Sequence, residues 1–186
     1  TQHLLASNPA LGPAVGVDVA PDAVAYATAH YGGPRVRFVA SDALHFEDAE
    51  GFDTIVSLET IEHVPDPAAL FAKLVSLLRP GGRLVASVPT TPSVDLNPHH
   101  LHDFSEASFA AFGARHGLRE VDRLKQVQRL ALGTAWRGRR FTREKLRANL
   151  PGYYLAHPDA LLRRVATTLR HGFANHYLTI AWEKSR

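Results

Sequence analysis

Short apolar runs alternate with helical repeats along the first two thirds of the chain. Runs at 14–17, 36–39, 52–58 and 83–88 have the length of buried strands. Before the last run, apolar residues recur at helical spacing from Leu70 to Leu78, and Arg-Pro-Gly-Gly at 79–82 breaks that predicted helix. Strands that alternate with helices in this way predict an α/β fold with a parallel, doubly wound sheet.

Acidic residues follow three of these predicted strands. Asp18 ends the first, Asp42 comes soon after the second, and Glu59 follows the third. Open α/β sheets bind ligands at the carboxyl ends of their strands, and an acid placed like Asp18 can accept both ribose hydroxyls of a nucleotide. Glu62 and His63 lie three and four residues after Glu59, so a helical turn would place all three on one face.

A second cluster of polar residues follows the strand predicted at 83–88. His99, His100 and His102 fall within four residues, and Ser105 is expected to cap a helix that holds this loop from one side. We expect His102 to be structural. Histidine titrates near neutral pH and suits proton transfer, so the candidate bases are His63, His99 and His100. The alternative for the two loop histidines is an exposed or already satisfied side chain.

Charge is unevenly distributed around a net value of +3. Residues 1–122 carry 7 Lys or Arg against 15 Asp or Glu, whereas residues 123–172 carry 12 against 2. The positive field of the second segment favours an anionic small molecule, such as a phosphorylated or carboxylated metabolite. A solvated helical face, a nucleic acid and a membrane surface remain open as alternatives. The basic residues include Arg123, Arg137, Arg139, Arg140, Arg143, Lys145, Arg147, Arg163, Arg164 and Arg170.

Four motifs, taken in order and spacing, resemble the second to fifth motifs of class I S-adenosylmethionine-dependent methyltransferases. They are Val-Gly-Val-Asp18, Ser-Asp42-Ala, the run from Phe52 to His63, and Leu-Arg-Pro-Gly-Gly-Arg83. The resemblance covers about residues 1–125 and is specific as a set. It implies a cofactor site with Asp18 at the ribose and Val19 beside it, Asp42 at the adenine amine, Ala43 as a backbone contact, and Leu58 and Glu59 next to the methionine moiety.

The family fold that the resemblance implies is a Rossmann-like, doubly wound, seven-stranded sheet whose last strand is antiparallel. Here the final pair would be 118–130 and 176–184, within a single domain of residues 1–186. The segment between them, 131–175, is then a basic helical insertion that serves as a lid, a substrate wall or an oligomer contact. It contains Trp136, Phe141, Tyr153 and Tyr154, and a helix predicted at 158–170 places Leu161, Leu162, Val165 and Leu169 on one face.

The family's glycine-rich loop is absent from this sequence. The chain starts with Thr1 and contains no methionine, so we expect the first strand and that loop to lie upstream. The lack of cysteine excludes disulfides and thiolate chemistry and favours a cytoplasmic protein. No apolar run approaches the ~20 residues of a membrane span.

Glu59, Glu62, His63 and His100 are also similar to the E-x-x-E-H…H set with which small-RNA 3′-terminal 2′-O-methyltransferases hold a divalent metal. Carboxylate and imidazole ligands would suit Mg²⁺ or Mn²⁺. The same Glu-Thr-Ile-Glu-His run is common in relatives assumed to lack a metal, so we expect none and keep these four residues as candidate ligands.

The resulting prediction is a methyltransferase that uses S-adenosylmethionine, releases S-adenosylhomocysteine and methylates a small-molecule acceptor, at oxygen in preference to nitrogen or carbon. A metal-assisted RNA 2′-O-methyltransferase is one alternative, although no RNA-binding module is recognisable and we expect no nucleic-acid partner. A methyltransferase-like binding partner without catalysis is the other.

Overall fold

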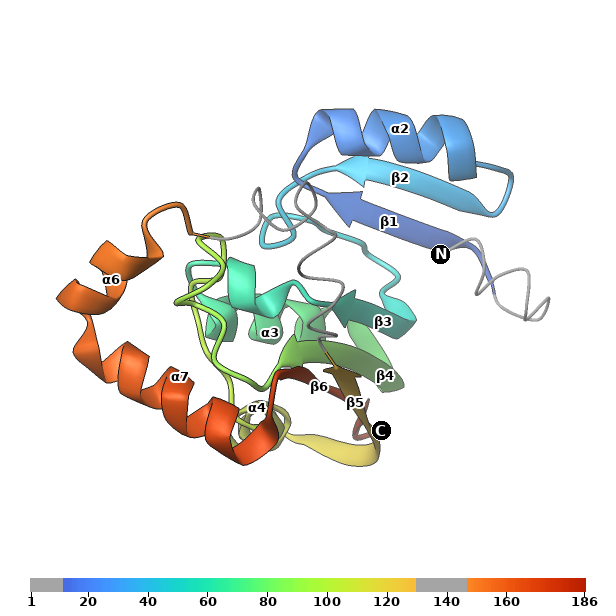
Figure 1. Cartoon of the computed structure of the whole chain (residues 1–186). Helices are drawn as coiled ribbons and strands as arrows, with labels where there is room; N and C mark the ends of the chain where they lie inside the picture. The colour runs from blue at the N-terminus through green and yellow to red at the C-terminus, as the bar shows by residue number, and fades with distance from the viewer. Residues whose placement is uncertain (1–11, 130–146) are drawn as a thin grey trace. The chain divides into compact units, whose positions relative to one another are not determined.

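The computed structural model describes residues 12–129 and 147–186 (Figure 1). The chain divides into two compact units, Thr1–Ala49 and Glu50–Arg186, which we describe separately. Several residues named in the sequence analysis lie outside the described residues: Trp136 and Phe141, and the basic residues Arg137, Arg139, Arg140, Arg143 and Lys145.

The first unit consists of strand β1 (Ala14–Asp18), helix α2 (Pro21–Tyr31) and strand β2 (Val36–Ala40). β1 and β2 pair in parallel over all five residues of each strand. Gly16 is required at the pairing, because a Cβ there would lie 2.5 Å from the ring of Phe38. The first two predicted strands are therefore confirmed, and α2 between them follows the predicted alternation of strands and helices.

The second unit is built on a four-stranded sheet in the order β3-β4-β6-β5. Its strands are β3 (Phe52–Leu58), β4 (Leu78–Pro89), β5 (Leu118–Arg129) and β6 (Ala174–Lys184). β3 pairs with β4 in parallel, while β6 runs antiparallel to both of its neighbours. The antiparallel final pair is confirmed. The described residues form six strands in two sheets, so the seven-stranded sheet stays a prediction.

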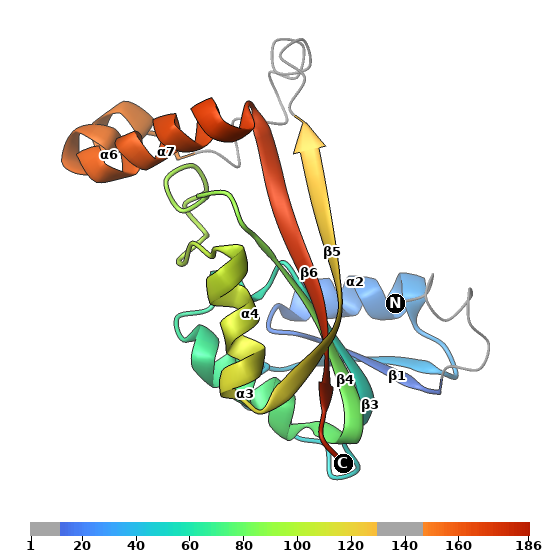
Figure 2. The same ribbon diagram turned by 90° about the horizontal axis from the view of Figure 1, so that it is seen from below.

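Helices α3 and α4 cover one face of this sheet (Figure 2). Phe71 of α3 and Phe109 of α4 pack edge-on against Trp182 of β6, with ring centroids 5.4 and 5.2 Å apart. Ser105 caps α4 through a reciprocal capping box with Ser108, which confirms the predicted cap. The helical segments of this unit are the 3₁₀ turn η1 (Ile61–His63), α3 (Pro67–Ser76), α4 (Glu106–Arg115), α6 (Leu150–Ala156) and α7 (Pro158–His171).

Two elements differ in their bounds from the prediction. The helix α3 ends before residues 79–82, as predicted, but the strand predicted at 83–88 is longer: β4 begins at Leu78 and includes these four residues. These four residues bulge out where the register with β3 shifts, and Gly81 adopts the left-handed conformation this requires (φ 77°). The helical turn expected over 59–63 is shorter: η1 starts at Ile61, and Glu59 before it has φ 51°.

Within the described part of the chain, we find no helix both long and apolar enough to cross a bilayer.

Candidate active site

The two acids predicted to bind a nucleoside lie at one edge of the first unit. Asp18 is the last residue of β1, and Asp42 follows β2; the Ser41 N–H donates to the carbonyl of Asp18 (3.0 Å). Each carboxylate accepts a hydrogen bond from the backbone two residues further on, Asp18 from Ala20 (2.8 Å) and Asp42 from Leu44 (2.9 Å). Both acids are exposed, so these bonds fix their direction in loops open to a ligand.

Val19 and Ala43 adjoin these acids. Val19 is 72% exposed, an unusual position for a valine in a folded unit, and Ala43 lies in the turn closed by the hydrogen bond from His45 N–H to Asp42 (3.0 Å). The first unit thus brings four of the predicted cofactor residues to one edge of its two-stranded sheet.

In the second unit, Glu59 leaves the end of β3 in a strained left-handed conformation that turns its side chain toward β4. The Ser87 hydroxyl donates to a Glu59 carboxylate oxygen (2.7 Å), and the Glu59 N–H donates to Ser87 (3.1 Å). Burial raises the pKa of Glu59, while Ser87 and the nearby His63 oppose that rise. Ser87 therefore fixes this carboxylate, a role that no sequence motif indicated.

A pocket of about 590 Å³ opens beside Glu59. Its walls come from the ends of β3 and β4 and from β5 and β6. The sequence motifs do not mark β5 or β6 as ligand-binding. Tyr177 donates from its hydroxyl to Gln128 across this pocket (3.3 Å). Burial and the negative charge of Glu59 raise the pKa of Tyr177, so it remains a hydrogen-bond donor at neutral pH. The lining residues are Leu58, Glu59, Ser87, Gln126, Val127, Gln128, Tyr177 and Thr179.

Glu62 is the most unusual side chain of the second unit. It is fully buried, and among the described residues neither carboxylate oxygen has a hydrogen-bond partner. Burial raises its pKa to about 7. A buried carboxylate without partners is costly, and such a group in a native fold calls for a ligand, an ion or a proton.

His63 and His100 lie against each other beside Glu62. Their rings make an edge-on contact with centroids 4.6 Å apart, and a nitrogen of His63 lies 3.9 Å from a Glu62 oxygen. Potential ligand atoms of Glu62, His63 and His100 all fall within 4.8 Å of one another. Glu59 does not join this group, since its carboxylate bonds to Ser87, so the structure brings together three of the four candidate metal ligands.

The two histidines are held differently. His63 Nδ1–H donates to the carbonyl of His99 (2.9 Å), and His100 Nδ1 bonds to the Ser93 hydroxyl (2.7 Å). Burial lowers the pKa of His100, and the charge of His63 adds to this effect. The His99 side chain is exposed. His102 bonds to the carbonyl of Val64 (3.0 Å), in keeping with the structural role expected of it.

The histidine loop is clasped by the segment that contains α6 and α7. Asp95, whose side chain is 4% exposed, pairs with Arg164 (2.5 Å) and accepts from the Tyr154 hydroxyl (2.7 Å). Arg164 also donates to the carbonyl of Pro92, and Arg147 donates to the carbonyl of Val94 (3.0 Å). We call this set, Asp95 with Tyr154, Arg147 and Arg164, the clasp.

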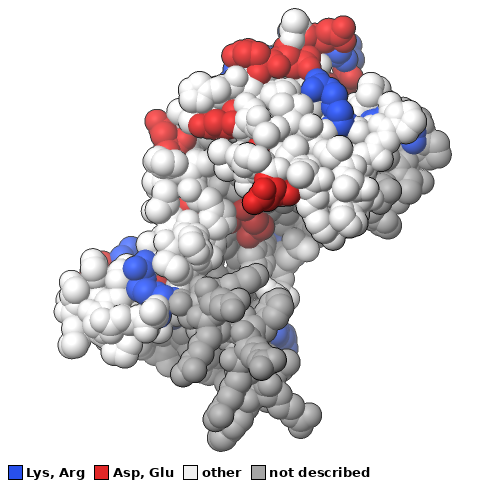
Figure 3. Space-filling view, turned by 90° about the horizontal axis from the view of Figure 1, so that it is seen from above, with Lys and Arg blue, Asp and Glu red and all other residues white. Residues whose placement is uncertain are grey.

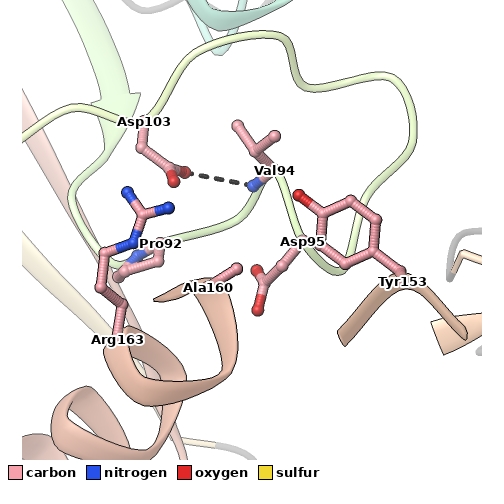
Figure 4. A pocket seen from close by; sticks show the side chains of 7 residues that line it. All are labelled: Pro92, Val94, Asp95, Asp103, Tyr153, Ala160 and Arg163. Atoms are coloured by element: carbon pink, nitrogen blue, oxygen red, sulfur yellow. Dashed lines mark hydrogen bonds between the residues drawn. The ribbon is translucent and has the colours of Figure 1, made fainter. Parts of the chain in front are cut away.

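A small pocket lies next to the clasp (Figure 4). Asp103 accepts a hydrogen bond from the Val94 N–H there (3.1 Å), and Arg163 and Tyr153 lie on its rim. Its volume of about 30 Å³ is that of a water-sized space, so it is a packing gap and no substrate site.

Much of the described basic segment is already paired. Arg123 bonds to Glu120 (2.5 Å), Arg163 to Asp159 (2.7 Å) and Arg164 to Asp95 (2.5 Å). The anionic acceptor expected from the charge pattern therefore stays a prediction.

Comparison with known proteins bears on the same residues. A family model described as a methyltransferase domain matches residues 2–86, which include Asp18, Asp42 and Glu59. The predicted resemblance to class I S-adenosylmethionine-dependent methyltransferases is thereby confirmed over this segment.

The curated relatives of this chain include ubiquinone biosynthesis O-methyltransferases. The one from Xanthomonas euvesicatoria is 32% identical over 127 residues, which cover 57% of this chain and 53% of the relative. The one from Xylella fastidiosa is 41% identical over 75 residues, covering 38% of this chain and 30% of the relative. The chain thus spans about half the length of the curated relatives it matches, or less.

Solved structures show the same fold. A methyltransferase of Bacillus halodurans described as putative superposes with a TM-score of 0.74 at 16% identity, covering 98% of this chain and 87% of that one. The N-methyltransferase NodS of Bradyrhizobium japonicum, bound to S-adenosylhomocysteine, gives 0.60 at 18% identity, covering 94% and 67%.

Proposed function

We propose that this protein transfers the methyl group of S-adenosylmethionine to an oxygen of a small-molecule acceptor. The observation that carries the proposal is the placement of Asp18 and Asp42 at the ends of two paired parallel strands, within the matched methyltransferase domain. Oxygen is favoured as the acceptor atom because the curated relatives are O-methyltransferases by name.

The family resemblance implies residues for the cofactor in each unit taken by itself. In the first, Asp18 beside Val19 would accept from the ribose hydroxyls, and Asp42 with Ala43 would meet the adenine. In the second, Leu58 and Glu59 would adjoin the methionine moiety. The Glu59 carboxylate is fixed by Ser87, and its negative charge suits the positive charge of that moiety.

The transfer is a displacement at the methyl carbon. A lone pair on the acceptor oxygen forms the new C–O bond, the C–S bond breaks, and its electrons remain on sulfur in S-adenosylhomocysteine. The protein's part is to align the two reactants and accept the hydroxyl proton.

We propose His100 as the base that accepts this proton, because burial keeps its ring neutral at pH 7. With Nδ1 donating to Ser93, its Nε2 would take the proton from the acceptor. His63, bonded to the His99 carbonyl, would position the His100 ring by edge-on contact and is the alternative base. The exposed His99 side chain is the third candidate.

A metal-assisted transfer, as in RNA 2′-O-methylation, is the second candidate function, and the partnerless Glu62 favours it. The residues present fit a divalent ion, because a carboxylate and two imidazoles converge within 4.8 Å. Glu62, His63 and His100 would hold such an ion, which would act on the acceptor oxygen as a Lewis acid.

Isothermal titration of the full chain with S-adenosylmethionine and S-adenosylhomocysteine tests the main proposal. Micromolar binding of both ligands, unchanged by EDTA, supports the proposal. If the protein binds neither ligand, the proposal is contradicted. For the second candidate, Mn²⁺ should raise the melting temperature of the wild type but not that of Glu62→Gln; equal shifts for the two proteins would exclude these ligands.

Three broader expectations belong to the same proposal. The absence of cysteine supports a cytoplasmic location. The excess of arginine in residues 123–172 supports an anionic acceptor. The Rossmann-like arrangement of the solved relatives supports a doubly wound sheet, with 131–175 as a wall of the acceptor site.

A further inference from the structure

Helix α7 turns an apolar stripe toward solvent. Leu162 and Leu169 are 70% and 83% exposed, and Leu161 and Val165 between them are 41% and 47% exposed. Their spacing places all four on one side of the helix. Phe173, just beyond the helix, is 59% exposed. A surface helix of a folded unit normally packs such a stripe into the core, so the stripe of α7 is oriented the opposite way.

The opposite side of α7 explains this orientation. Ala160, 6% exposed, and the guanidinium of Arg164 face the protein, where Arg164 pairs with Asp95 and bonds to Pro92. Turning the stripe inward would break this half-buried ion pair and leave the buried Asp95 carboxylate without its positively charged partner, which is costly. The clasp therefore fixes α7 with its apolar side outward.

The charges around the stripe select an anionic partner. The described segment 147–173 contains four arginines and a single acid, Asp159. Arg163 and Arg170, seven residues apart, lie on the flank of the helix next to Leu162, and Arg163 pairs there with the exposed Asp159 (2.7 Å). Figure 3 shows blue arginine atoms next to white, uncharged surface on the lobe of α6 and α7.

A second copy of this chain fits the stripe less well. Specific protein interfaces take roughly 20–30 residues from each partner, whereas the stripe offers five apolar side chains. A twofold pairing of α7 helices would also bring the same arginine-rich flanks toward each other.

We propose that α7, together with Phe173, binds the surface of bilayers that contain anionic phospholipids. The helix would lie in the plane of the membrane, with its leucines at the boundary between headgroups and acyl chains and Arg163 and Arg170 at the headgroup phosphates. A helix of 14 residues is about 21 Å long, too short to cross the hydrocarbon core, and its strong amphipathicity is that of an interfacial helix. This binding does not depend on methyl transfer.

Co-sedimentation of the full chain with vesicles tests the proposal. Vesicles of phosphatidylcholine alone are compared with vesicles that also contain phosphatidylglycerol. We expect the wild type to bind the mixed vesicles, and this binding to weaken as salt is raised. In the double variant Leu162→Glu/Leu169→Glu, the fraction bound to vesicles should fall by at least about tenfold, because the burial energy of two leucines is lost. The matched control is Leu124→Glu, since Leu124 is 57% exposed on β5, away from the stripe.

Circular dichroism checks that the wild type, the double variant and the control are folded. We expect all three to fold, because the substituted side chains are exposed. Absence of binding to the mixed vesicles would overturn the proposal, as would equal binding by the Leu162→Glu/Leu169→Glu variant. A dimer in size-exclusion chromatography that this variant alone converts to monomer would also overturn it, because the stripe would then belong to a second copy.

Discussion

Asp18 is directed by one backbone hydrogen bond at the end of β1, and its exposed carboxylate is the proposed ribose acceptor. We expect Asp18→Ala to weaken binding of S-adenosylhomocysteine by about 10- to 100-fold, because hydrogen bonds to a charged group contribute about 1.5–3 kcal/mol. Titration calorimetry measures this effect. Asp22→Ala, an exposed acid of α2 in the same unit, is the control and should bind as the wild type does.

His100 is expected to act on the acceptor and not on the cofactor. In His100→Ala, kcat should fall by about 10²- to 10⁴-fold, the usual contribution of a general base, while the Kd for S-adenosylhomocysteine stays unchanged. The measurement is a methyl-transfer assay alongside calorimetry. His30→Ala, an exposed histidine of α2, should retain full activity. A full rate in His100→Ala would remove this residue from the mechanism.

The sequence predicts the location of a single residue where a motif places it at the end of a strand. It does not predict a hydrogen bond to a partner that is distant along the chain. Asp18, Asp42 and Glu59 follow strands, and their neighbourhoods could be inferred from that alone. The hydrogen bond of Glu59 to Ser87 spans 28 residues and has no periodic signal. The burial of Glu62 was also hidden, because a glutamate in a polar run is indistinguishable from a solvated one until the fold covers it.

At the scale of elements, the clasp joins the histidine loop to α6 and α7. We expect Arg164→Ala to reduce the free energy of unfolding by about 3–5 kcal/mol, since it leaves the Asp95 carboxylate buried without its partner. Urea unfolding measures this. The exposed pair of Arg163 with Asp159 provides the control: Arg163→Ala should cost less than about 1 kcal/mol. Equal losses in both variants would contradict the structural importance of the clasp.

The elements themselves were mostly predictable. Helical spacing from Leu70 predicted α3, and spacing from Leu161 predicted α7, although not that its apolar face would be exposed. The start of β4 was less predictable, because Pro and two Gly at 79–82 end the helical pattern but form a bulge inside the strand. The clasp could not be predicted, because Arg164 lies 69 residues from Asp95 and looks like one more member of a basic segment.

At the scale of the whole molecule, the clasp gives stability a pH dependence. Burial alone raises the pKa of Asp95, but its bonds to Arg164 and Tyr154 hold that pKa below the ordinary value. A depressed carboxyl pKa contributes stability above the pKa of the unfolded state, about 4, and this contribution is lost as pH falls through the native-state pKa. The melting temperature of Asp95→Asn should therefore approach that of the wild type in acid. A difference in melting temperature between the two proteins that stayed constant from about pH 7, where a carboxyl is ionised, to about pH 2, where it is protonated, would contradict this.

The position of β6 between β4 and β5 has a consequence during synthesis of the protein. β6 supplies Leu178, Ile180 and Trp182 to the core, yet Leu84 of β4 meets its partner Trp182 only when the end of β6 has left the ribosome. Until then, both neighbouring strands expose edges that can pair with other chains. Although β3 and β4 can pair without β6, completion of the four-stranded sheet waits for this late segment, and nascent chains that pause before Ala174 would depend on chaperones to remain free of aggregation.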